Sequence, residues 1–167
     1  MPTIGRFLGG IAALIYRTED ERYLLLRRSP AKDFSSGVWE CVTGRVDQGE
    51  GFEQALHREV GEELGAQVEV ELILGTTHFH RGAPTAENEL IGVVCLCRLA
   101  GPADHIRISP EHDMLRWVTI GEAQELLSAS DASTTWIGRL LLRAELLRRL
   151  APPDLLQAYR QVGIELG

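Results

Sequence analysis

Three glutamates on one predicted helix are the residues of this sequence best suited to chemistry. Glu59, Glu62 and Glu63 lie within the stretch GRVDQGEGFEQALHREVGEELGA, residues 44–66. Residues three and four apart are neighbours on a helix surface, so these carboxylates can converge. Carboxylates held close together and partly shielded from water raise each other's pKa values unless a cation neutralises them. Oxygen ligands favour Mg²⁺, and Mn²⁺ can take its place.

The helix that carries these glutamates is expected from about residue 51 to residue 64, with Gly65 as its C-terminal cap. Its apolar side consists of Phe52, Leu56, Val60 and Leu64. At about 100° per residue, Glu63 falls within roughly 20° of Phe52 and Leu56, and Glu59 about 20° to the other side of Phe52. A solvated helix keeps its acids away from its apolar stripe. The pattern therefore favours a site that needs negative charge.

The residues around the helix suggest a supporting scaffold. Gly44 and Gly49 flank a loop in which glycine permits a close backbone approach, and a carbonyl near Gly44 could supply a further metal ligand. Arg58 can pair with Glu62, one turn away, or with Glu50 at the helix start. We expect Arg58 to have a scaffold role in preference to a substrate contact.

This stretch resembles the Nudix box, G-x5-E-x7-R-E-U-x-E-E-x-G-U, where U is aliphatic. The matching residues are Gly44, Glu50, Arg58, Glu59, Val60, Glu62, Glu63 and Gly65. One position departs, because Ala66 stands where a larger aliphatic residue is usual. The resemblance implies Mg²⁺-dependent hydrolysis of a nucleoside diphosphate linked to another group, with Glu59, Glu63 and Glu62 as metal ligands.

The identity of the general base stays open at this stage. Family members differ, so Glu59 or Glu62 could take the proton from water, or the base could come from a loop outside the box. Glu111, in SPEHDMLRW, is the best outside candidate, and its alternative is a solvated turn acid. Glu87 and Glu89 are weaker candidates.

Cations are expected to meet the phosphates or the leaving group. The candidates are Arg28, Arg45, His78 and His80. For the arginines the alternative is a solvated surface position, and for the histidines a half-exposed pair on one strand. Zinc is disfavoured, since no third ligand with suitable spacing accompanies the histidines.

The segment before the box bears on the substrate. Val42, Thr43 and Gly44 resemble the branch of the family that hydrolyses dATP and dihydroneopterin triphosphate. Alternatives are a hydrolase of the diadenosine polyphosphate or ADP-ribose type, a non-catalytic Nudix-like ligand-binding or regulatory domain, and an isopentenyl diphosphate isomerase type that would use Cys41.

The length and composition of the sequence fit a single domain over residues 1–167, which the resemblance identifies as a Nudix hydrolase domain. Net charge is −7, which argues against nucleic-acid polymers and anionic membranes as partners and leaves small phosphorylated molecules. The three cysteines form no C-x-x-C pair, and reduced thiols suit a cytoplasmic protein.

The predicted elements make an α/β protein of the α+β type, a Nudix-like α/β/α sandwich around a mixed sheet. A buried strand at residues 7–17 and a second at 22–29 are expected to form a hairpin, VWECVT a short strand leading into Gly44, and MLRWVTI the last strand. Helices are expected from about residue 121, with a break at Pro152 and Pro153. The apolar stripe of the long helix consists of Trp136, Ile137, Leu140, Leu141, Ala144 and Leu147. Packing on the sheet is the first interpretation of this stripe and a dimer contact the alternative, so the protein is expected to be a monomer or a homodimer.

Overall fold

The apolar segment near the N-terminus forms the central strand of a mixed sheet. In the computed structural model, which describes residues 5–31, 36–128 and 131–167, β1 (Leu8–Arg17) pairs in parallel with β6 (Glu89–Ala100). β6 pairs antiparallel with the long edge strand β5 (Gln67–His80). β1 also forms the predicted hairpin with β2 (Arg22–Arg28).

The segment predicted as one short strand before Gly44 is two strands. β3 (Trp39–Glu40) pairs with β2, whereas β4 (Val42–Arg45), which contains Gly44, pairs with β1. The partner changes because β1 and β2 are paired only next to their connecting turn. β7 (His112–Val118) pairs with β2 as well. The end of β2 is therefore in register with both β3 and β7.

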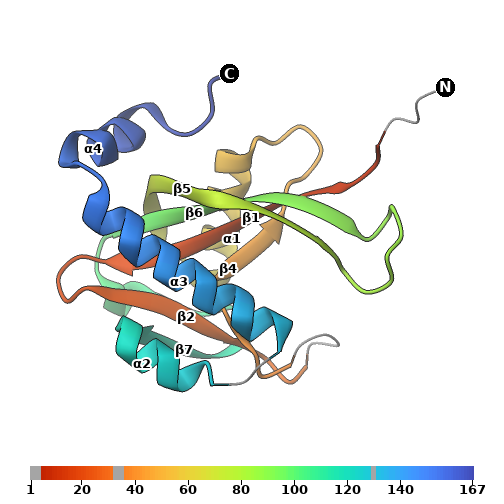
Figure 1. Cartoon of the computed structure of the whole chain (residues 1–167), viewed down its shortest axis with the longest axis horizontal. Coiled ribbons are helices and arrows are strands. Elements are labelled where there is room, and N and C mark those ends of the chain that lie inside the picture. The colour runs from red at the N-terminus through yellow and green to blue at the C-terminus, as the bar shows by residue number, and fades with distance from the viewer. Residues whose placement is uncertain (1–4, 32–35, 129–130) are drawn as a thin grey trace.

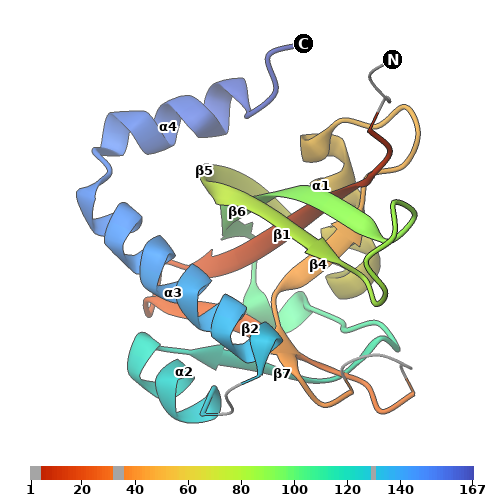
Figure 2. The same ribbon diagram turned by 45° about the vertical axis from the view of Figure 1, so that its right-hand side comes forward.

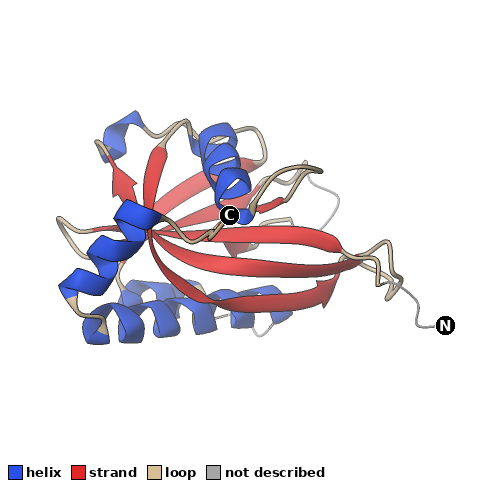
Figure 3. Cartoon of the chain, turned by 90° about the horizontal axis from the view of Figure 1, so that it is seen from above, coloured by secondary structure: helices blue, strands red, loops and turns tan. Residues whose placement is uncertain are grey.

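Helices cover both faces of the sheet, as the view from above shows (Figure 3). Alternate side chains of a strand point to opposite faces, so Ile11 and Ile15 of β1 pack beneath α1 (Phe52–Leu64) while Ala12 and Leu14 belong to the core under α3 (Ala132–Leu150). α2 (Ile120–Leu126) lies beside α3 on the same face (Figure 2), and a single 3₁₀ turn (Ala103–His105) precedes β7. The predicted α/β sandwich is confirmed.

The C-terminal helices follow the predicted break. α3 ends at Leu150, and α4 (Pro153–Val162) begins after Pro152 and lies against the edge strand β5 (Figure 1). The predicted apolar stripe of α3 packs on the sheet, with four residues buried and Trp136 and Leu147 partly buried against them. None of the helices in the described ranges is both long and apolar enough to cross a bilayer.

Candidate active site

The helix α1 has the ends that the sequence predicts. It stops at Gly65, whose φ of 59° is left-handed and whose N–H donates to the Gly61 carbonyl. At the other end, Gly51 has no side chain to cap the free N–H groups, and the Glu165 carboxylate accepts the Phe52 N–H at 2.6 Å. The C-terminal tail therefore caps the helix that carries the glutamates.

Arg58 holds the loop before α1 against the helix. Its guanidinium donates to both oxygens of Glu50 at 2.8 and 2.9 Å, to Glu59 at 2.9 Å and to the Arg45 carbonyl at 2.9 Å. The hydrogen bonds from Arg58 and then from the Asp47 N–H lower the pKa of Glu50 to about 2. The predicted pair with Glu50 is confirmed, and Glu62 lies further away at 3.5 Å.

Gly44 is the surface against which the Glu59 carboxyl group packs. A Cβ added at Gly44 would lie 2.0 Å from Cδ of Glu59, well inside van der Waals contact. Glu59 is therefore held between the backbone of β4 on one side and Arg58 on the other, with only 16% of its side chain exposed. Any residue other than glycine at position 44 would displace this carboxylate.

Glu63 is buried on the apolar side of α1, as the helical wheel predicts. Burial raises its pKa to about 9, and the negative charges of Glu40, Glu59 and Glu111 act in the same direction. Its Oε2 has no hydrogen-bond partner among the described residues. An ionised carboxylate in this place is only partly compensated, since Arg28 lowers its pKa but burial and the three acids outweigh this effect.

A chain of polar side chains that sequence reasoning missed borders Glu63. His112 of β7 is buried, with Nε2 3.0 Å from Glu40 Oε1 and Nδ1 3.9 Å from Glu63 Oε2. Glu40 of β3 accepts from Arg28 of β2 at 3.2 and 3.3 Å. In the sequence, the one hint of a role for His112 was its position directly after Glu111. Its closeness to Glu40 and Glu63 depends on the register of three strands.

Glu111, the predicted outside acid, lies in the exposed turn before β7. The Ser29 N–H donates to its backbone carbonyl at 2.8 Å, which joins this turn to the end of β2. Because its charge contributes to the raised pKa of Glu63, the fold brings it to the same region as the box. Glu89, by contrast, lies 2.9 Å from His78 at the far end of β5, and Glu87 lies in the adjoining exposed loop.

The candidate cations are not brought to one place. Arg28 is beside Glu40 and lowers the pKa of Glu63. Arg45 is exposed and is paired with Gly10 of β1. Its neighbour Gly44 is paired with Ile11, which lies in the core under α1. Since successive side chains of a strand point to opposite faces, Arg45 points to the face of the sheet away from α1. His78 and His80, with ring centroids 5.8 Å apart, lie two strands beyond β1.

The acids of the box fit a divalent cation in their chemistry. Glu59 is fixed against Gly44, and Glu63 presents a buried oxygen without a partner. Hard carboxylate oxygens suit Mg²⁺ or Mn²⁺. In the described part of the chain no three acid, histidine or cysteine side chains already stand grouped around one ion position, so the arrangement supplies the donors without a preassembled cage.

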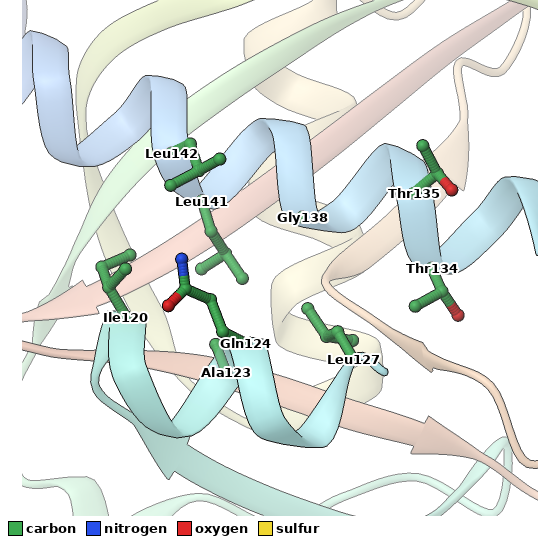
Figure 4. A pocket seen from close by; sticks show the side chains of 9 residues that line it. All are labelled: Ile120, Ala123, Gln124, Leu127, Thr134, Thr135, Gly138, Leu141 and Leu142. Carbon is green, nitrogen blue, oxygen red and sulfur yellow. The ribbon is translucent and has the colours of Figure 1, made fainter. Parts of the chain in front are cut away.

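A cavity between two helices lies away from these acids. It is lined by residues of α2 and α3, among them Ile120, Ala123, Leu127 and Leu141 (Figure 4). These helices belong to the core on the face opposite α1. The cavity therefore contributes nothing to the site around Glu63.

Comparison with known proteins shows which family has this sandwich and this acidic helix. The NUDIX domain model matches residues 7–137. The chain belongs to the Nudix family, and its domain is that of a Nudix pyrophosphohydrolase acting on nucleotide substrates. Such hydrolases act on small phosphorylated molecules and generally use divalent metal ions.

The relatives and solved structures cover between 70% and 90% of this chain. It is 31% identical to the dihydroneopterin triphosphate diphosphatase of Escherichia coli K12 over 128 residues, 70% of this chain and 81% of that protein. It is also 32% identical to the octanoyltransferase of Myxococcus xanthus over 117 residues, which are 70% of this chain. The match spans only 32% of the length of that protein. The MutT protein structure from Methanosarcina mazei Go1 has a TM-score of 0.67 at 22% identity and covers 90% of this chain and all of that one.

Proposed function

We propose that this chain hydrolyses a pyrophosphate bond in a nucleoside triphosphate or a similar compound, and that the reaction requires Mg²⁺ or, in its place, Mn²⁺. The observation that carries the metal requirement is the buried Glu63 carboxyl, which lacks a compensating partner beside Glu59. The substrate class is supported by Val42, Thr43 and Gly44 before the box and by the similarity to the E. coli dihydroneopterin triphosphate diphosphatase.

The roles of the site residues are part of this proposal. Glu59, Glu62 and Glu63, with the Gly44 carbonyl, hold the cation, while Glu50, Arg58 and Gly65 fix the loop and the helix. A bound divalent cation screens the phosphate oxygens and lowers the pKa of a water ligand. The candidates for accepting the proton of the attacking water are Glu59, Glu62 and Glu111. Of the candidate substrate contacts Arg28, Arg45, His78 and His80, Arg28 lies nearest to the box acids, whereas a contact from the other three requires a substrate that extends away from Glu63.

A substrate screen tests this function. Wild-type protein is incubated with nucleoside triphosphates, dihydroneopterin triphosphate, dinucleoside polyphosphates and ADP-ribose, with Mg²⁺, with Mn²⁺ and with a chelator. We expect a triphosphate to be the best substrate, with release of pyrophosphate and no turnover in the chelator. Glu63→Gln should lose most of the activity, whereas Glu125→Gln, an exposed acid of α2, should keep it. Full activity of Glu63→Gln would refute the metal assignment.

The alternative that would need a reactive cysteine is disfavoured by burial. Cys41 is 1% exposed, and burial raises the pKa of its thiol further above the ordinary value. A thiol in that state is a poor nucleophile or acid–base group at neutral pH. Product analysis would separate an isomerised from a hydrolysed diphosphate. A non-catalytic, ligand-binding role would instead give a melting-temperature shift without turnover.

The location, the oligomeric state and the domain organisation complete the proposal. We place the protein in the cytoplasm as a monomer or homodimer and treat residues 1–167 as one domain. The last point is supported by α4 and the tail, which lie beyond residue 137 and still contact both cores.

A further inference from the structure

The polar chain Arg28–Glu40–His112 ends on the buried side of Glu63. The side chains of Glu40 and His112 are 16% and 3% exposed, and that of Glu63 is 8% exposed. Burying this many ionisable groups is costly unless they act together. Three different strands and one helix supply them, so the grouping is a product of the fold.

The strand pairings place the members of this polar cluster next to one another. Arg28 of β2 is directly paired with His112 of β7, and Leu26 of the same strand is paired with Glu40 of β3. Each polar side chain therefore projects from a backbone that is hydrogen-bonded to β2. Groups on paired strands hold their positions more precisely than groups on loops.

The contacts follow one another from Arg28 through Glu40 and His112 to Glu63. Arg28 binds Glu40 through both carboxylate oxygens, and Glu40 lies at hydrogen-bond distance from His112 Nε2. The other ring nitrogen, Nδ1, faces Glu63 Oε2 at 3.9 Å, and neither atom has a hydrogen-bond partner among the described residues. Two unpartnered buried atoms facing each other are not expected in a cluster that serves only to hold the strands together.

We propose that Glu40 and His112 are positioning residues that orient the Glu63 carboxylate for binding a divalent cation. The inference rests on the proposed function, since it assigns Glu63 to the metal. Glu40 fixes the orientation of the imidazole ring, and the ring restrains Glu63 from its buried side. Outer residues that orient a ligating carboxylate typically change metal affinity about 10–100-fold when they are replaced.

The experiment measures Mn²⁺ affinity, without turnover, from the electron paramagnetic resonance signal of free Mn²⁺. We expect Glu40→Gln and His112→Ala each to raise the dissociation constant about 10–100-fold. Asp113→Asn is the matched control, because Asp113 is the next residue of β7 but pairs instead with Arg27 of β2 at 2.7 and 2.9 Å. Its affinity should equal that of the wild type.

A double-mutant cycle separates positioning from a general structural effect. If His112 and Glu40 act through Glu63, replacing either of them no longer changes Mn²⁺ affinity once Glu63 is glutamine. A loss of affinity that comes from a general structural change would persist in the Glu63→Gln background. Glu40→Gln keeps the size of the side chain, so it carries the test if His112→Ala does not fold. The proposal is overturned if Glu40→Gln binds Mn²⁺ as the wild type does, or if its effect is unchanged without Glu63. Failure of the proposed function is distinct, since wild type would then neither bind Mn²⁺ nor hydrolyse any substrate.

Discussion

At the residue scale, Gly44 shows how the box depends on a missing side chain. The Glu59 carboxyl occupies the space where a Cβ would be. We predict that Gly44→Ala destabilises the protein by about 1–3 kcal/mol, the usual cost of overpacking, and weakens Mn²⁺ binding because Glu59 is displaced. Urea unfolding and a Mn²⁺ titration measure the two effects. Gly61→Ala is the control, since Gly61 lies within α1 near its C-terminal end and nothing lies within 4 Å of its added Cβ. Alanine there should stabilise the helix by about 0.5–1 kcal/mol.

Glu63 gives a prediction on pH in the metal-free protein. Its pKa is about 9 in the folded chain against an ordinary value of 4.5, so between these values the folded state binds more protons than the unfolded state. The free energy of unfolding should therefore fall as pH rises through this window, by up to about 1.4 kcal/mol per pH unit. Urea unfolding in a chelator at pH 5 to 9 measures the slope. Glu63→Gln should flatten it, and an identical slope in this variant would contradict the assignment.

How far the sequence predicts this site depends on what fixes each contact. The burial of Glu63 follows from helical geometry and was predicted, and the pairing of Arg58 with Glu50, at short sequence separation, was one of two predicted alternatives beside Glu62. The grouping of Glu40 and His112 joins residues 72 positions apart, and it needs the register of β2 with β3 and β7. No periodicity in one segment contains that information, so these residues were missed.

At the scale of elements, α1 and its neighbours also divide into features that local sequence determines and features that distant pairings determine. Gly65 was predicted as the cap because the signal is local, whereas the two-strand division at Cys41 was not, because it depends on where β1 and β2 separate. The N-terminal cap of α1 was also missed. Gly51 offers no side chain, and the carboxylate that replaces it comes from Glu165, 113 residues away from Phe52.

This distant cap gives a prediction about the helix. A negative charge near a helix N-terminus is favourable, and loss of a capping acceptor costs about 0.5–2 kcal/mol. We therefore expect Glu165→Ala to lower the free energy of unfolding by this amount and to increase amide hydrogen exchange in the first turn of α1. Glu125→Ala, which removes an exposed acid of α2 on the opposite face of the sheet, should leave that turn unchanged. Equal exchange at Phe52 in wild type and Glu165→Ala would show that the cap is not formed in solution.

At the scale of the whole molecule, the C-terminal segment joins the two cores around the edge strand. Leu156 and Tyr159 of α4 pack against the core under α3, whereas Ile164 packs against the core under α1. Between them, Arg160 Nη1 lies 3.5 Å from Glu71 of β5. Glu71 is 4% exposed and also lies 3.6 Å from Arg98 Nε. The pKa of this acid is raised, because burial outweighs the opposing effect of Arg160 and Arg98. Glu71 therefore provides a polar attachment of α4 to the sheet.

The attachment can be tested by removing either charge. Arg160→Ala leaves Glu71 buried with Arg98 as its remaining close cation, and we expect a loss of about 1–3 kcal/mol in the free energy of unfolding, the typical cost of an undercompensated buried polar group. Adding Glu71→Gln should restore part of the loss, because a neutral amide is cheaper to bury than a charge.

Arg149→Ala is the control, since Arg149 is 71% exposed in its ion pair with Glu145 and exposed pairs contribute about 0–1 kcal/mol. Urea unfolding compares the four proteins. If Arg160→Ala costs no more than Arg149→Ala, α4 is held by its apolar contacts alone, and the polar attachment at Glu71 has no measurable part in joining the two cores.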